Sequence, residues 1–275
     1  MRVSTTVLAL AALASSTFAA SIHHRHAHMH NKRSPDINEA LAGATPVQQT
    51  TSSSPTPTPS PAASSNNVVS SWFSELSTLL TEIGIVAEGA NPTSSGSGVW
   101  IGSDGTYTNT FYNQASETVV LVVWGPQGSW VNTITPLITQ AISPGESITL
   151  SFANGQSGAF SALYSDTILI NGQIFGTWGE YTFAGGSSTV DVSREVNMAG
   201  HTLEIKTPQC VTNMNTCVFV CNSGNSCETG YSLENCAIGS QPGANYGTVN
   251  YGSGDVPSGG CSGMGNSAQL QTYFS

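Results

Sequence analysis

Cations are scarce in this chain beyond Arg33. Of the 6 Lys and Arg residues only Arg194 and Lys206 follow that point, whereas all 16 Asp and Glu residues do, which gives a balance of 2 minus 16, or −14. A protein that binds nucleic acid needs clustered Lys and Arg to displace the counterions of the phosphates, so no nucleic-acid partner is expected. The partners that this charge favours are neutral molecules, such as glycans, or basic ones.

Histidine is scarce as well, because His201 is the one imidazole after Arg33. A serine hydrolase needs a histidine base beside its nucleophile, and the chain has no Gly-x-Ser-x-Gly turn to present such a serine. His201 follows Gly200 and precedes a β-prone run at 202–205, so we expect a surface histidine at a strand end. No catalytic residue is assigned.

Long hydrophobic runs are missing too. The first apolar stretch, residues 7–14, is too short to span a bilayer as a helix and is followed by small residues, so residues 1–20 are predicted to be a secretory signal peptide. Residues 21–33 hold five of the six histidines and end in Lys32 and Arg33, which we interpret as a kexin-type processing site. Alternating histidines are good copper or zinc ligands. Cleavage after Arg33 would discard them, so neither a metal nor a cofactor is expected in the mature protein.

The next three segments are interpreted as a stalk, a helix and a linker. Residues 34–67 are rich in Ser, Thr and Pro and have too few apolar side chains to offset the entropy of ordering, which predicts a disordered stalk. Residues 68–90 carry apolar side chains at the spacing of a short amphipathic helix. Its polar face lacks Lys and Arg, so packing on the globular domain or on a second copy is favoured over a membrane. Residues 91–98 are interpreted as a short linker.

From residue 99 to 275 short runs of β-branched and aromatic residues alternate with Gly, Asn, Asp and Ser. The clearest runs are 118–124, 147–152, 158–164 and 181–183. An Asn-Gly pair at 171–172 separates two further runs and is a strong hairpin signal. With no helical stretches between the strands, the pattern predicts one all-β domain, a β-sandwich.

Cysteine is absent from the first three quarters of the chain. The six cysteines are Cys210, Cys217, Cys221, Cys227, Cys236 and Cys261. An even number in a secreted protein predicts disulfides, here three that staple a loop-rich C-terminal region. Zinc binding is disfavoured because no Cys-x-x-Cys pair occurs. The disulfide pairing stays open at this point.

The layout resembles the fungal secreted family named after the fourth Aspergillus fumigatus allergen. The resemblance covers most of the chain: the signal peptide, the dibasic junction, the Ser/Thr/Pro stretch and three motifs in the C-terminal domain. These motifs are 123–125 (Val-Trp-Gly), 177–183 (Thr-Trp-Gly-Glu-Tyr-Thr-Phe) and 190–193 (Val-Asp-Val-Ser). Proteins of this kind are regarded as allergens and candidate effectors, and the resemblance implies no enzymatic activity.

A second resemblance, over a shorter stretch, is to thaumatin-like proteins. Glu180 within 179–183 matches the glutamate of an "AEFTL"-type strand, and Asp191, followed by Gly200, matches a "DVS" segment. The resemblance implies a thaumatin-like β-sandwich in which these acidic residues line a cleft linked to β-glucan binding and, in some members, to weak glucanase activity. The chain departs from that family in having fewer cysteines and no equivalent of the cleft arginine, since Arg194 comes just after the motif.

Four residues are therefore the candidate ligand-binding residues: Glu180, Asp191, Asp166 and Trp178. Trp178 would stack on a sugar face, although aromatic residues of sandwich strands are mostly core. Two of the carboxylates would serve a glycosidase if they flanked the scissile bond. The competing interpretation makes Glu180 and Asp191 structural, satisfied by backbone N–H groups.

The sequence thus favours a secreted, non-enzymatic protein that is extracellular or associated with the cell wall. We expect it to bind a cell-wall glycan or a host component. One alternative is an endo-β-1,3-glucanase that uses Glu180 with Asp191 or Asp166. Another is a structural coat protein of the wall.

Overall fold

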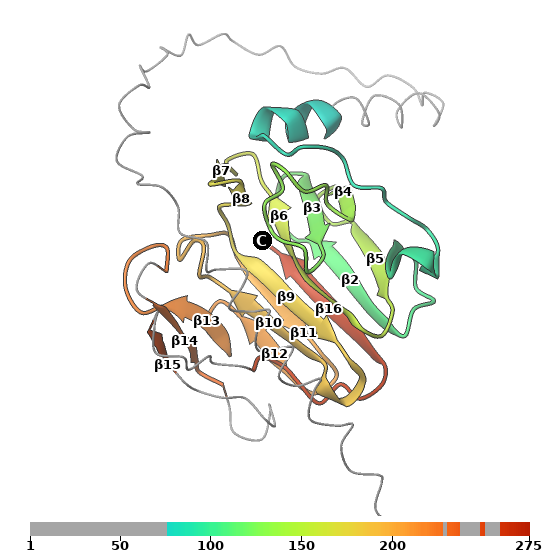
Figure 1. Cartoon of the computed structure of the whole chain (residues 1–275), viewed down its shortest axis with the longest axis vertical. Coiled ribbons are helices and arrows are strands. Elements are labelled where there is room, and N and C mark those ends of the chain that lie inside the picture. The colour runs from blue at the N-terminus through green and yellow to red at the C-terminus, as the bar shows by residue number, and fades with distance from the viewer. Residues whose placement is uncertain (1–75, 228–229, 237–247, 251–258) are drawn as a thin grey trace, which may run out of the picture.

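The computed structural model describes residues 76–227, 230–236, 248–250 and 259–275. Within these residues β-strands dominate, and they form two large sheets that pack around one hydrophobic core (Figure 1). The prediction of an all-β sandwich is confirmed. The expected signal peptide, pro-segment and stalk lie outside the described residues.

One sheet has six strands, and its central strand comes from the C-terminal end of the sequence. Their order is β1 (Val99–Ile101), β5 (Ser147–Phe152), β2 (Tyr107–Asn113), β16 (Ala268–Phe274), β11 (Leu203–Lys206) and β12 (Val211–Asn213). β16 pairs in parallel with β2 and antiparallel with β11. The red strand between the green and orange strands in Figure 1 shows this insertion.

The other sheet has eight strands. Their order is β15 (Thr248–Asn250), β14 (Gly230–Glu234), β13 (Val218–Cys221), β10 (Thr189–Ser193), β9 (Trp178–Phe183), β6 (Gln156–Leu163), β3 (Val119–Trp124) and β4 (Ile138–Ile142). All pairs are antiparallel except β10 with β13. Two 3-10 turns, η2 (Ser95–Ser97) and η3 (Gly185–Ser187), precede β1 and β10. β9 and β10, which carry three of the four candidate residues, lie in the middle of this sheet.

The core follows from the two-residue alternation of the strands. In β3, Val119, Leu121 and Val123 point into the space between the sheets. Val120, Val122 and Trp124 point to the opposite face and are buried there in a second apolar cluster. An antiparallel strand that is apolar on both faces needs a cover on each face.

That cover is a helix over residues 76–83 together with a small hairpin, β7 (Leu169–Ile170) and β8 (Gln173–Ile174). Leu76 and Leu80 of the helix are buried against the outer face of the eight-stranded sheet, as expected for packing on the globular domain. No helix in the described ranges is long and apolar enough to cross a membrane. The hairpin turn at Asn171 and Gly172 has φ angles of 54° and 80°, as a type I′ turn requires, so the predicted hairpin is confirmed.

The interpreted linker 91–98 runs against the domain. Asn91 Oδ1 accepts a hydrogen bond from the backbone N–H of Thr139 at 2.8 Å, and the carbonyl of Pro92 accepts one from Ile101 at 2.7 Å. Together with the 3-10 turn η2, these bonds connect the helix to β1 along the surface of the sandwich.

All six cysteines form disulfides, which confirms that part of the sequence prediction. The pairs are Cys210–Cys261, Cys217–Cys236 and Cys221–Cys227. The pairing is nested, with each bridge inside the loop closed by the previous one. The outermost bridge contributes its sulfurs to the core between the sheets, whereas Cys217 belongs to a small separate cluster with Phe219, Tyr231 and Leu233.

Candidate functional site

The structure brings Glu180 and Asp191 together. They lie directly opposite each other in the register of β9 and β10, so their side chains leave the same face of the sheet, where cross-strand neighbours are about 5 Å apart. Both are buried, with 3% and 6% of their surface exposed, and Glu195 beyond the end of β10 is buried beside them. Glu195 was not among the residues predicted from the sequence, although its position just after the Val-Asp-Val-Ser motif was an available signal.

The disulfide-linked C-terminal segments close over this acidic cluster. Gly260, next to the bridged Cys261, lies so close that an added Cβ would be 2.7 Å from Asp191 Cβ. The backbone N–H of Cys227 donates a hydrogen bond of 2.9 Å to the carbonyl of Glu195. Burial raises the pKa of Asp191 well above its ordinary value, and the neighbouring carboxyls of Glu180 and Glu195 and a hydrogen bond with Glu180 raise it further.

This geometry differs from that of a glycosidase. Two catalytic carboxyls lie on either side of a sugar bond, at least about 5 Å apart, and each faces open space. Here Glu180 and Asp191 stand directly opposite each other on neighbouring strands, and both are buried. Burial and the repulsion between adjacent carboxyls both favour the protonated form of Asp191, the direction in which its pKa is shifted. The arrangement supports a structural role for the pair.

Asp191→Asn is expected to stabilise the protein at neutral pH. Folding raises the pKa of Asp191 above its ordinary value of 3.8, so the folded protein keeps a proton that the unfolded chain releases as pH rises past that value. The free energy of unfolding therefore falls with rising pH, by up to about 1.4 kcal/mol per pH unit for one proton. Asparagine has no titrating carboxyl, so the variant should lack this fall in the free energy of unfolding. Urea denaturation between about pH 4 and about pH 8 measures both slopes.

The matched control is Glu146→Gln, which neutralises an exposed carboxylate in the turn before β5. Its pH slope should follow that of the unmodified protein. If Asp191→Asn were the less stable protein at neutral pH, Asp191 would be ionised in the folded state and its carboxylate would be a stabilising group.

Trp178 lies on the same face as Glu180 but is fully buried. Its indole N–H donates a 2.9 Å hydrogen bond to the carbonyl of Ile174 in β8, and its ring meets that of Trp124 edge to face at 5.0 Å. Gly179, next along β9, leaves room for a core ring, since a Cβ there would lie 2.2 Å from Phe160 Cζ. Trp178 thus anchors the hairpin to the sheet and presents no ring face for a sugar to stack on.

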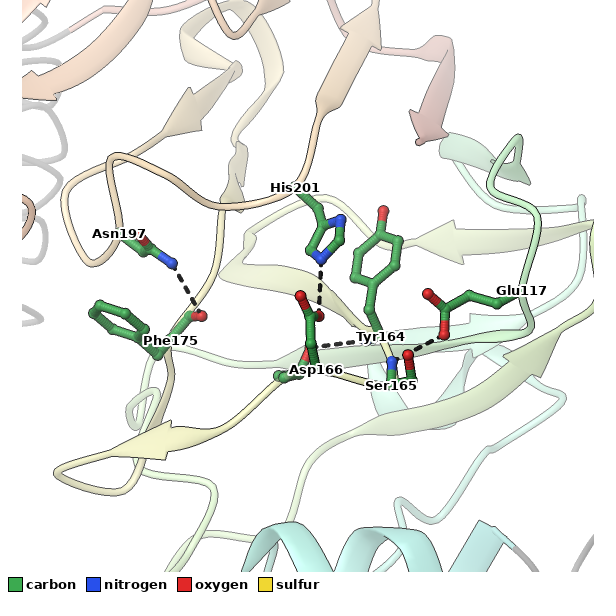
Figure 2. A network of polar contacts seen from close by, with 8 residues as sticks. Glu117, Tyr164, Ser165, Asp166, Phe175, Asn197 and His201 are labelled. Atoms are coloured by element: carbon green, nitrogen blue, oxygen red, sulfur yellow. Dashed lines mark hydrogen bonds and ion pairs between the residues drawn. The ribbon is translucent and has the colours of Figure 1, made fainter. Parts of the chain in front are cut away.

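Asp166 lies apart from the acidic cluster, at the mouth of an open pocket. Its Oδ1 is 2.8 Å from His201 Nε2, and both side chains are accessible, at 72% and 41% exposure. Figure 2 shows the His201 ring standing beside the ring of Tyr164, and the two are stacked with centroids 3.7 Å apart. His201 is a surface histidine just before β11, as expected, but its pairing with Asp166 was not visible from the sequence.

The pocket has a volume of about 280 Å³ and opens at one end of the sandwich. We call it the inter-sheet pocket, because both sheets line it: Ala162 from β6, Leu203 from β11 and Phe274 from β16 form apolar walls. Polar groups of Asp166, His201 and Asn197 lie around it. Asn197 Nδ2 donates to the carbonyl of Phe175 at 3.4 Å, which ties two of the surrounding loops together (Figure 2).

The charge around the pocket is negative. Glu117 accepts a hydrogen bond from the backbone N–H of Ser165 at 3.0 Å, next to Asp166. Burial raises the pKa of Tyr164, and the charges of Glu117 and Asp166 raise it further, so its phenol stays protonated. Neither Arg194 nor Lys206 lines the pocket. Within the described ranges no group of three His, Cys, Asp or Glu side chains is placed to hold a metal ion.

The fold and these sites define a disulfide-stapled β-sandwich with a buried acidic cluster and an open, acidic pocket. The profile of the Allergen Asp f 4-like domain matches residues 102–251, more than half of the 275 residues. The chain therefore belongs to this allergen-like family, as its motifs indicated.

Among solved structures, the chain is similar to the thaumatin-like xylanase inhibitor TLXI, with 14% identity and a TM-score of 0.31 over 60% of this chain and 97% of that one. A comparison with curated proteins finds no match.

Proposed function

We propose that this Asp f 4-like protein is an extracellular, non-enzymatic protein that binds neutral cell-wall glycan in the inter-sheet pocket. The observation that carries the proposal is that the pocket lining contains a single carboxylate, Asp166, beside imidazole and amide groups. One carboxylate can accept hydrogen bonds from sugar hydroxyls, whereas glycoside hydrolysis needs two. Three disulfides and the predicted signal peptide support an extracellular location.

Size and charge support this choice of ligand. A volume of about 280 Å³ is at the lower end of small-molecule sites, which suits a single ring better than a large ligand. The carboxylates of Asp166 and Glu117 oppose the approach of anionic sugars or phosphates. A polar mouth over apolar walls matches a sugar ring, which has hydroxyls at its edge and C–H groups on its faces.

Blocking the pocket is expected to abolish binding in the pocket and so to weaken capture by insoluble glycan. Ala199 is exposed at the rim of the pocket, so Ala199→Phe adds a ring there with little effect on the core. Asp166→Asn keeps the shape and removes the charge, and should weaken binding about tenfold, the effect of one charged hydrogen bond. A pull-down on insoluble β-1,3-glucan and chitin, with released reducing sugar assayed in the same tube, measures binding and hydrolysis together.

The matched control is Ser187→Phe, which adds the same ring at an exposed position in η3, beyond the opposite end of β9. It should bind as the unmodified protein does. If the protein releases sugar and Glu180→Gln abolishes that release, the protein is a glucanase and the proposal is wrong. Binding that is equal in all variants would refute the pocket as the glycan site, and no binding at all would turn the search to a host component or a coat role.

A further inference from the structure

A second surface, independent of the pocket, lies on the outer face of the six-stranded sheet. The alternation in β16 buries Leu270 and Phe274 between the sheets and leaves Gln269 and Gln271 exposed on the other side. On the neighbouring strands β2 and β5 the outward residues Thr110, Tyr112 and Thr149 are half-buried. We call this surface the open face; its central residues are Thr110, Tyr112, Thr149, Gln269, Gln271 and Tyr273.

The open face is uncharged, although the chain is strongly acidic. Its central side chains are hydroxyls, amides and phenols. The adjoining strand β11 adds one carboxylate, Glu204, and one cation, Lys206, whose Nζ is 2.9 Å from Glu204 Oε1. This pair balances its own charge, so the face neither attracts nor repels a charged partner strongly.

The side chains of the open face hold one another in place. Tyr112 and Tyr273 are opposite in the parallel register of β2 and β16, and their rings stack at 5.0 Å with 13° between the planes. Lys206 Nζ lies 4.6 Å from the centre of the Tyr273 ring. Tyr273 Oη donates to Gln271 Oε1 at 3.0 Å. A surface that is ordered before binding loses little side-chain entropy when a ligand settles on it.

We propose that the open face binds an extended, uncharged polysaccharide chain that lies along the sheet. Protein partners usually bury an apolar centre, and the central residues of the open face include no aliphatic side chain. Polyanions need free cations, and Lys206 is already paired with Glu204. A neutral polymer with hydroxyls along both edges matches the hydroxyl and amide groups, and its C–H groups match the apolar side-chain atoms of the half-buried Tyr112 and Tyr273. This assignment stands on a different surface from the proposed pocket function.

The test compares a polymer with a short soluble sugar. The double variant Tyr112→Ala/Tyr273→Ala, made in the full-length protein, should bind insoluble β-1,3-glucan roughly tenfold more weakly. Its binding of a soluble β-1,3-linked trisaccharide, which tests the pocket, should stay unchanged. Ala199→Phe should lose the trisaccharide. A wrong assignment of the pocket therefore shows in the trisaccharide assay, and a wrong assignment of the open face shows in the insoluble-glucan assay.

Two outcomes would overturn the proposal. The first is a double variant that binds insoluble glucan as tightly as the unmodified protein does, or an unmodified protein that binds none. The second is a change of oligomeric state in the double variant, measured by sedimentation, which would make the open face a contact between copies. If the double variant fails to fold, Gln271→Ala at an exposed position is the substitute, and it should weaken polymer binding roughly threefold.

Discussion

Removal of the Cys210–Cys261 disulfide is expected to lower the free energy of unfolding by about 4 kcal/mol. The bridge closes a loop with a sequence separation of 51 residues, so its loss releases the most chain entropy in the unfolded state. The Cys221–Cys227 bridge spans 6 residues, and its removal should cost about 2 kcal/mol by the same relation. Urea denaturation of Cys210→Ala/Cys261→Ala and Cys221→Ala/Cys227→Ala measures both values.

The order of the two values is the decisive point. Cys261 is fully buried in the core and pairs with Val190 of β10 in an isolated bridge, so the long-range disulfide also holds the segment that covers Asp191. The Cys221–Cys227 bridge could instead prove the more stabilising of the two. Chain entropy would then not be the main contribution of these disulfides, and local packing around Glu195 would be the explanation.

Trp178→Ala is the second substitution with a large expected effect, a loss of about 3–5 kcal/mol, as for other buried aromatic residues. The ring is fully buried between Trp124, the helix and β8, and the substitution would leave a cavity and the carbonyl of Ile174 without its indole donor. Thermal unfolding followed by tryptophan fluorescence and by circular dichroism measures the loss.

Trp130→Ala provides the comparison, because Trp130 is only half-buried and lies outside the apolar clusters of the described residues. It should cost clearly less than Trp178→Ala. Trp178→Phe, which keeps most of the ring, should fall between the two alanine variants. Glycan binding that disappears in Trp178→Phe while stability is retained would contradict the structural role of Trp178 and restore it as a ligand-binding residue.

The strands were predictable because their signals are local. The apolar run that became β3 and the Asn-Gly turn between β7 and β8 depend on neighbours in sequence. The number of disulfides followed from composition. The disulfide pairing and the insertion of β16 between β2 and β11 depend on contacts between distant segments, which no local pattern encodes.

The candidate residues also divide into those that local sequence signals place and those that only long-range contacts bring together. The sequence placed Glu180 on a strand and Asp191 in a motif after it, but whether they face a cleft or lie under a cover depends on the segment around Gly260. Asp166 and His201 are 35 positions apart in the chain, and only the loops at the end of the sandwich bring them to one pocket. Glu180 and Asp191, on two strands that are neighbours in sequence, were therefore grouped correctly, whereas the site formed by several loops was not.

The position of β16 also governs the order in which the molecule can assemble. Tyr107 of β2 pairs with Ala268, 268 minus 107 or 161 positions later in the chain. Until residues 268–274 have been synthesised, β2 and β11 have no strand between them, and the six-stranded sheet stays in two halves. Pairings this distant in sequence make folding slow. A chain that folds during its synthesis must therefore hold an incomplete sandwich, with apolar strand faces accessible to chaperones, until β16 has been made.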